Sequence, residues 1–228
     1  MCRTLIILVG PQGVGKTTLA RTLYWSYVSS KKCPVAMITA DIANIVYTIY
    51  LRIISYYKGI YVRFYPDQPR VLRPDPKVLP KLWIVEFLVS LFGHILALLK
   101  VMFLLLFYDI VIEHEGFTFK FIANFAYDQY MYTRMITKSR STNGITRALT
   151  RILIITIYSL IGLSKLTKSR IYVINVHSTY NKLVSRYRFR GTPIEPRHYI
   201  EFQLSIYNLI EKCLRSLTMT INVVRVCT

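Results

Sequence analysis

The sequence predicts an α/β fold of three layers, in which a five-stranded parallel sheet has helices on both faces. Five short apolar runs have the length and composition of strands that are buried on both sides. In chain order these runs are TLIILV (4–9), PVAMIT (34–39), DIVIE (109–113), IYVINV (171–176) and INVVRV (221–226). Longer helical patterns lie between them, and this alternation is typical of βαβ units and a parallel sheet.

The composition favours one domain over residues 1–228 and a polyanionic partner. With 53% hydrophobic residues the chain has ample material for a core, and its net charge of +19 indicates nucleotides, nucleic acid or an acidic membrane surface. The four cysteines form no C-x-x-C pair and no disulfide scaffold, so a reducing, cytoplasmic location is expected. A glycine-rich stretch interrupts the first apolar run too early for a signal peptide.

The stretch GPQGVGKT, residues 10–17, fits the P-loop pattern G-x-x-x-x-G-K-[ST]. An apolar run precedes it and a helical spacing follows it, which is the strand, turn and helix that the motif requires. Glycines let backbone N–H groups close around phosphate oxygens at the positive end of a helix dipole. We therefore expect a nucleoside triphosphate here, with Lys16 on the β- and γ-phosphates and the Thr17 hydroxyl on Mg²⁺. The residues expected to hold the nucleotide are Gly10, Pro11, Gln12, Gly13, Val14, Gly15, Lys16, Thr17 and Thr18.

Three further segments complete the predicted organisation. Five prolines between residues 66 and 80 predict an irregular connector, and the polar stretch KSRSTNG (138–144) predicts a second break. Residues 82–108 form an apolar stretch long enough to span a bilayer. On a helix, one narrow stripe of this stretch holds Glu86, Ser90, Gly93, Ala97 and Lys100. We expect a buried or half-buried helix, with membrane contact or a true span as the alternatives. His94 is expected to be a satisfied polar residue rather than a ligand.

A basic cluster near the end of the sequence is followed by a characteristic helix. Arg186, Arg188 and Arg190 alternate, RGTPIEP (190–196) breaks the helix, and a new helix follows from about Arg197. This helix carries the pattern Y-I-x-x-Q-x-x-x-Y at Tyr199, Ile200, Gln203 and Tyr207. A solvated basic loop is the simplest interpretation of three arginines alone.

The order of these features resembles the lid region of thymidylate kinases and related P-loop nucleotide kinases, with the lid-like region at 185–197. The resemblance implies that Arg186 and Arg190, or Arg188 in place of one, close over the triphosphate and stabilise charge on the transferring phosphoryl group. It also implies that the lid arginines are exposed until nucleotide binds.

The resemblance covers residues 1–40 and 170–228, and the middle of the chain departs from it. The family has an arginine for the acceptor monophosphate after the second strand, whereas this chain has TADIAN there, with Asp41. No arginine occurs between Arg73 and Arg134, where the family has one that helps to read the base. The resemblance therefore implies a divergent relative, with a different acceptor or without kinase activity.

Carboxylates follow the third predicted strand, where the family has an Asp-Arg pair. Glu113 and Glu115 flank a histidine, and a carboxylate at this strand end can hold a Mg²⁺-bound water or accept the proton of an acceptor hydroxyl. Either residue fits this role, and Asp41 is a weaker candidate. The alternative is that Glu113 pairs with a surface lysine and Glu115 only begins the next helix.

Two functions remain open from the sequence. The first is a nucleotide kinase that uses ATP and Mg²⁺ to phosphorylate a nucleoside monophosphate of the dTMP type. The second is an NTP-hydrolysing switch or accessory ATPase that engages nucleic acid or membrane through its basic surface. The sequence has no N-K-x-D base-reading motif and no helicase motif series, which favours the kinase. A homodimer stays open as a further partner.

Overall fold

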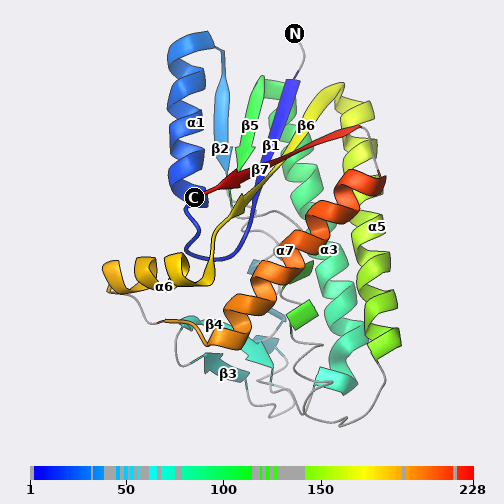
Figure 1. Ribbon diagram of the computed structural model, residues 1–228. Helices are drawn as coiled ribbons and strands as arrows, with labels where there is room; N and C mark the ends of the chain where they lie inside the picture. The colour runs from blue at the N-terminus through cyan, green and yellow to red at the C-terminus, as the bar shows by residue number, and fades with distance from the viewer. Residues whose placement is uncertain are drawn as a thin grey trace.

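The computed structural model describes residues 3–31, 33–38, 45–46, 49–50, 52–53, 56, 62–65, 68–74, 79–114, 119, 122–123, 126–127, 142–191, 194–217 and 220–228. Helices lie on both sides of a central sheet (Figure 1).

The central sheet has five strands, all parallel, in the order β2-β5-β1-β6-β7. The strands are β1 (Arg3–Val9), β2 (Val35–Ile38), β5 (Ile110–Glu113), β6 (Ser169–His177) and β7 (Ile221–Cys227). Each of the five predicted apolar runs is therefore a strand of this sheet. Since the chain leaves β1 toward β2 on one side and later adds β6 and β7 on the other, the carboxyl end of β1 is the point where the strand order reverses.

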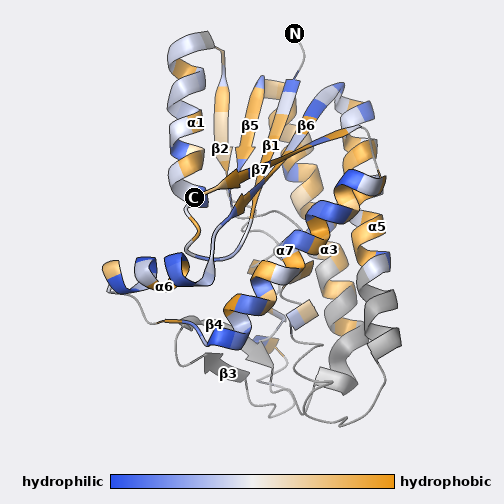
Figure 2. Cartoon of the chain, viewed as in Figure 1, coloured by the Kyte–Doolittle hydropathy of each residue, from blue (hydrophilic) through white to orange (hydrophobic). Residues whose placement is uncertain are grey.

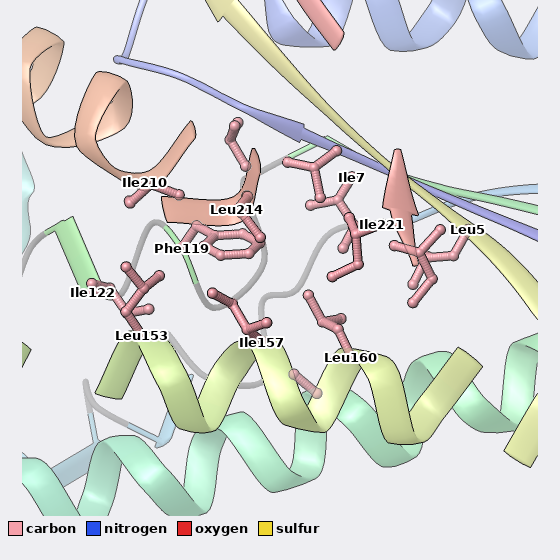
Figure 3. Close-up of a cluster of buried hydrophobic side chains, with 14 of the residues drawn as sticks. Leu5, Ile7, Phe119, Ile122, Leu153, Ile157, Leu160, Ile210, Leu214 and Ile221 are labelled. Carbon is pink, nitrogen blue, oxygen red and sulfur yellow. The ribbon is translucent and has the colours of Figure 1, made fainter. Parts of the chain in front are cut away.

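The central strand β1 is buried on both faces, and its side chains alternate between two cores. Leu5 and Ile7 point into the larger core with α3 (Leu79–Phe107), α5 (Thr142–Thr167) and α7 (Arg197–Leu217) (Figure 3). Ile6 and Leu8 point to the opposite face, which α1 (Lys16–Lys31) covers. The expected sheet with helices on both faces is confirmed.

The predicted irregular connector at 66–80 is wrong in part. An antiparallel pair of strands, β3 (Val62–Tyr65) and β4 (Gln68–Pro74), occupies much of it, and α3 already begins at Leu79. Prolines are tolerated there because each strand of a two-stranded sheet has a free edge, where a missing N–H costs no ladder hydrogen bond. The polar break at 138–144 is also shorter than predicted, since α5 begins at Thr142.

The long apolar helix α3 is half-buried, as expected. Gly93 and Ala97 of the predicted stripe lie on its buried face, together with Val101 and Leu105. The small residues let the helix approach the sheet closely. His94 is also buried, and burial lowers its pKa to about 4, so the imidazole is neutral at pH 7.

One window among the described helices, Thr150–Thr167 in α5, is long and apolar enough by length and composition to cross a membrane. Its residues Leu153, Ile157 and Leu160 pack into the larger core (Figure 3). The helices that cover a parallel sheet commonly have such a composition, so this window does not by itself indicate a span.

A buried carboxylate ties α7 to the edge of the sheet. Glu211 accepts hydrogen bonds from Asn175 Nδ2 on β6 (2.7 Å), from Arg225 Nε on β7 (2.9 Å) and from Arg215 Nε on its own helix (3.1 Å). Burial by itself raises the pKa of this carboxyl, but the three sets of hydrogen bonds outweigh burial and hold the pKa below its ordinary value. The charged form of Glu211 therefore stabilises the fold.

We expect Glu211→Gln to lower the free energy of unfolding by about 1–3 kcal/mol, because the charge that three donors share is lost. Since the pKa of Glu211 is lowered in the folded state, the wild type holds this advantage above the unfolded value of about 4.3 and loses it as the pH falls further. Urea unfolding at pH 7 and pH 3 measures both effects. Glu201→Gln is the matched control on the same helix, because Glu201 forms an exposed pair with Arg197 and should change stability by less than about 1 kcal/mol. Equal stabilities of the two variants at pH 7 would contradict the role of Glu211.

Candidate functional site

The glycine loop joins β1 to α1 and has a backbone that glycine alone adopts readily. Gly10, Gly13 and Gly15 have φ angles of 139°, 77° and 103°. A Cβ atom on Gly10 would lie 2.4 Å from the carbonyl oxygen of Val176 on β6, a distance that real Cβ atoms do not show. The glycines of the motif are therefore required by this turn and by its close approach to β6.

Lys16 is the first residue of α1, and its side chain folds back over the loop. Its Nζ donates hydrogen bonds to the carbonyl oxygens of Gly10 (2.7 Å) and Pro11 (2.8 Å). The ammonium group is thus held at the N-terminus of α1, where the first N–H groups of the helix have no intrahelical acceptor. Thr17 and Thr18 follow in the first turn with exposed side chains. Loop, helix end and lysine together form a site suited to an anion.

The short helix α6 (Tyr180–Phe189) lies against this loop. Thr179 caps the start of α6 by accepting a hydrogen bond from the Lys182 N–H, and Gly191, with a φ of 62°, follows its end. Tyr187 is buried against Gly13 and donates from its hydroxyl to the Gln12 carbonyl (3.2 Å). Burial, and then the charge of Glu195, raise the pKa of Tyr187, so the phenol stays neutral.

Arg186 reaches the glycine loop from the same helix. Its Nη1 donates to the carbonyl oxygen of Val14 at 2.7 Å and to Oγ1 of Thr228 at 3.2 Å. The same nitrogen lies 3.9 Å from the position that a Cβ atom on Gly15 would take. A second cation, supplied by α6, therefore lies at the loop.

The two arginines expected to act together are in different places. Arg186 is half-buried and bound to the loop, so the expectation that it is exposed before nucleotide binds is wrong: the Val14 carbonyl already holds it. Arg190 is exposed at the C-terminal cap of α6, where its backbone N–H donates to the Arg186 carbonyl. Arg188 is exposed as well. The structure brings only Arg186 of this cluster to the loop.

Glu113 ends β5, the strand next to β1. It is fully buried, and its Cα is paired in register with Ile7 of β1 and Ile38 of β2. It therefore lies near the carboxyl edge of the sheet. Its partner on β1, Ile7, is two residues before Val9, the last residue of that strand. His114 follows, and its Nδ1 lies 3.0 Å from the Ile38 carbonyl, which requires the tautomer protonated on Nδ1. Glu115 and Asp41 lie outside the described residues.

Sequence reasoning missed two residues that hold the loop. Thr228 places its hydroxyl between the carbonyl oxygens of Val14 (3.2 Å) and His177 (3.1 Å), and no motif marks it. Gln203 accepts a hydrogen bond from the Gln12 N–H at 3.3 Å and donates to the Tyr199 hydroxyl at 2.6 Å. The signal for Gln203 was present in the Y-I-x-x-Q-x-x-x-Y pattern, whose four named residues all lie on the buried face of α7.

An aromatic cluster continues from Gln203 away from the loop. The ring of Tyr199 packs edge-on against Tyr127 with centroids 4.7 Å apart, and the Tyr127 hydroxyl lies 3.0 Å from Nε2 of His198. Phe202 also packs edge-on against Tyr127. The glycine loop is thus joined to the start of α7 through hydrogen bonds and edge-on ring contacts.

Comparison of the sequence with models of known protein families gives no match, and comparison with curated proteins gives none either. What the site can do is therefore argued from its geometry.

We expect Gly10→Ala to lower the free energy of unfolding by at least about 1–3 kcal/mol, because the added methyl group meets the Val176 carbonyl and the φ of 139° is strained for alanine. Gly162→Ala on α5 is the matched control. No atom lies within 4 Å of its added Cβ, and alanine should stabilise the helix by roughly 0.5–1 kcal/mol. Thermal unfolding of both variants gives the comparison, and a Gly10→Ala protein as stable as the wild type would contradict the close approach of the loop to β6.

Proposed function

We propose that this protein is a P-loop phosphotransferase that binds ATP with Mg²⁺ and transfers the γ-phosphoryl group to a nucleoside monophosphate. The observation that carries the proposal is the position of Arg186: its guanidinium lies on the glycine loop that also holds the Lys16 ammonium. Phosphoryl transfer depends mainly on positioning and on cations near the transferring group. Two cations at one glycine loop supply both requirements.

Lys16 and Arg186 have different roles in this proposal. The lysine exchanges the carbonyl oxygens of Gly10 and Pro11 for phosphate oxygens when the triphosphate enters the loop. Arg186 exchanges the Val14 carbonyl for the oxygens that gain charge in the transition state, where its planar fork binds better than a point charge.

The residues around the loop fit a Mg²⁺ ion that arrives with the nucleotide. Thr17 presents an exposed hydroxyl in the first turn of α1, and Glu113 lies at the end of the neighbouring strand. Mg²⁺ usually keeps several waters and binds one or two protein oxygens together with phosphates. In the described part of the chain no three His, Cys, Asp or Glu side chains gather around one point, which agrees with nucleotide-dependent binding rather than a permanent metal cage.

In this proposal the acceptor binds at the carboxyl edge of β5, on the Glu113 side of the loop, because ligands of parallel sheets bind where the strand order reverses. Glu113 is suited to accept a proton or to hold a metal-bound water there. The class of acceptor rests on the resemblance to thymidylate kinases. The lack of arginines between Arg73 and Arg134 favours the second candidate, an NTP-hydrolysing switch or accessory ATPase that needs no acceptor phosphate.

A coupled ADP-release assay over nucleoside monophosphates, nucleosides and a no-acceptor control tests the proposal. We expect turnover to depend on a monophosphate and Lys16→Ala to abolish it. Circular dichroism and the melting temperature of this variant should stay close to the wild type, because the loop carbonyls that Lys16 bonds to can also bond to water. ADP release at the same rate without any acceptor would favour the hydrolysing switch. Unchanged turnover in Lys16→Ala would reject both candidates.

Arg186→Ala should lower kcat far more than it raises the KM for ATP, with a loss on the order of 10³-fold, because the charge is needed mainly in the transition state. Arg186→Lys should rescue little of it. Arg188→Ala is the matched control, since Arg188 lies exposed two residues away on the same helix. Arg190→Ala tests separately whether the arginine at the end of α6 takes part.

The opposite outcome for Arg186 is equally clear. If the arginines form a patch for a polyanion, turnover of Arg186→Ala stays within about twofold of the wild type, and binding to nucleic acid weakens with a reduced salt dependence. That result would remove Arg186 from the catalytic machinery.

A further inference from the structure

The outward face of α3 is apolar along its described length. Its exposed side chains recur every three or four residues and cover about one third of the helix circumference. They are Val85, Leu88, Phe92, Ile95, Leu99, Phe103, Leu106 and Phe107. We call these eight residues the α3 stripe. Leu99 and Phe103 near its middle are 50% and 59% exposed, and Phe103 packs against Phe107.

The opposite face of α3 is apolar too, because Ala97, Val101 and Leu105 pack into the larger core. Figure 2 shows the described part of α3 as mainly hydrophobic, whereas α6 is largely hydrophilic. A helix that is hydrophobic all round is normally buried on all sides, and soluble proteins rarely expose a continuous apolar strip of this kind. The α3 stripe is therefore a contact surface whose partner is absent.

The charge of the chain identifies the kind of partner. Taken together, α3 and α5, which packs beside it, carry more basic than acidic residues. The two helices carry Lys81, Lys100, Arg147, Arg151 and Lys165 against a single acid, Glu86. Of these, Arg151 and Lys165 are exposed, and Lys100 is half-buried at the border of the stripe. The whole chain has a net charge of +19 and a mean hydropathy of +0.36.

A second copy of the chain fits these properties less well than a lipid surface does. It would bring another +19 charges, and the eight side chains of the stripe offer no hydrogen-bonding group, whereas protein interfaces make about one hydrogen bond per 100–200 Å². An anionic bilayer attracts basic side chains at its surface and takes apolar side chains into the headgroup and acyl boundary. We propose that the α3 stripe binds the surface of an anionic lipid bilayer, with α3 lying in the plane of the interface.

This placement leaves the candidate nucleotide site accessible. Helix α1, which begins with Lys16, lies on the opposite face of the sheet from α3 and α5 (Figure 1). The proposal does not depend on the chemistry of the loop, and phosphate-site variants such as Lys16→Ala should bind lipid as the wild type does.

Flotation with vesicles of phosphatidylcholine alone, and of phosphatidylcholine with 30% phosphatidylserine, tests the proposal. We expect the full-length wild type to float with the phosphatidylserine vesicles in 150 mM salt and to bind pure phosphatidylcholine more weakly. The double variant Leu99→Gln/Phe103→Gln should bind at least tenfold more weakly, because its apolar contacts are removed while every charge is kept. Both side chains are exposed, so the melting temperature should stay unchanged. Trp25→Gln on α1 is the matched control, an exposed apolar residue on the other face that should not affect binding.

Two outcomes would overturn the proposal. If the double variant floats as well as the wild type, the basic surface binds the vesicles without the stripe. If the wild type fails to float and light scattering shows a dimer that the double variant no longer forms, a second copy covers the stripe. Nucleotide turnover of the double variant, measured in parallel, separates loss of lipid binding from loss of the folded site.

Discussion

The structure depends on one close approach, that of the glycine loop to β6. Gly10 passes the carbonyl oxygen of Val176 so closely that no side chain fits between them. Because of this contact, β1 can end beside β6 and the chain can turn sharply into α1. The N-terminus of α1 then points at the carboxyl edge of the sheet, and Lys16 lies over the loop instead of over the strand ends.

The loop is held in this shape from several directions. Tyr187 and Arg186 bind it from α6, Gln203 from α7, and Thr228 from the residue after β7. Most of these contacts end on backbone carbonyls or N–H groups of the loop, which would otherwise need water. A loop whose polar backbone groups are satisfied by fixed side chains keeps one geometry, and a site for a highly charged ligand requires such preorganisation.

The strands and the loop could be predicted from sequence because their signals are local. A run such as residues 5–9 is apolar at every position because both faces of β1 are covered. The loop has a motif in which each glycine has a steric reason. The place of Glu113 at the end of β5 could be predicted for the same reason, because an apolar run ends at this acid. The β3 and β4 pair was missed because prolines mark breaks in helices and central strands but are harmless at free edges.

The site as a whole could not be predicted, because its parts meet only through the fold. Nothing near Thr228 in the sequence indicates a contact with Val14, and the alternating arginines 186, 188 and 190 look equivalent until α6 turns one of them toward the loop. The sequence also did not show that Gly93 and Ala97 face the core. Both faces of α3 are apolar, so packing of the helix against the sheet determines which face is buried.

The hydrogen bonds that hold the loop join residues very far apart in the sequence. They span 191 residues to Gln203, 172 to Arg186 and 214 to Thr228. In chain order the loop precedes all three partners, so during synthesis its glycine turn lacks these contacts until α6, α7 and β7 have been made. Contacts of such separation also slow folding, because a long loop must close before any of them forms. The shape of the loop therefore depends on folding of the whole sheet and not on the sequence of the loop alone.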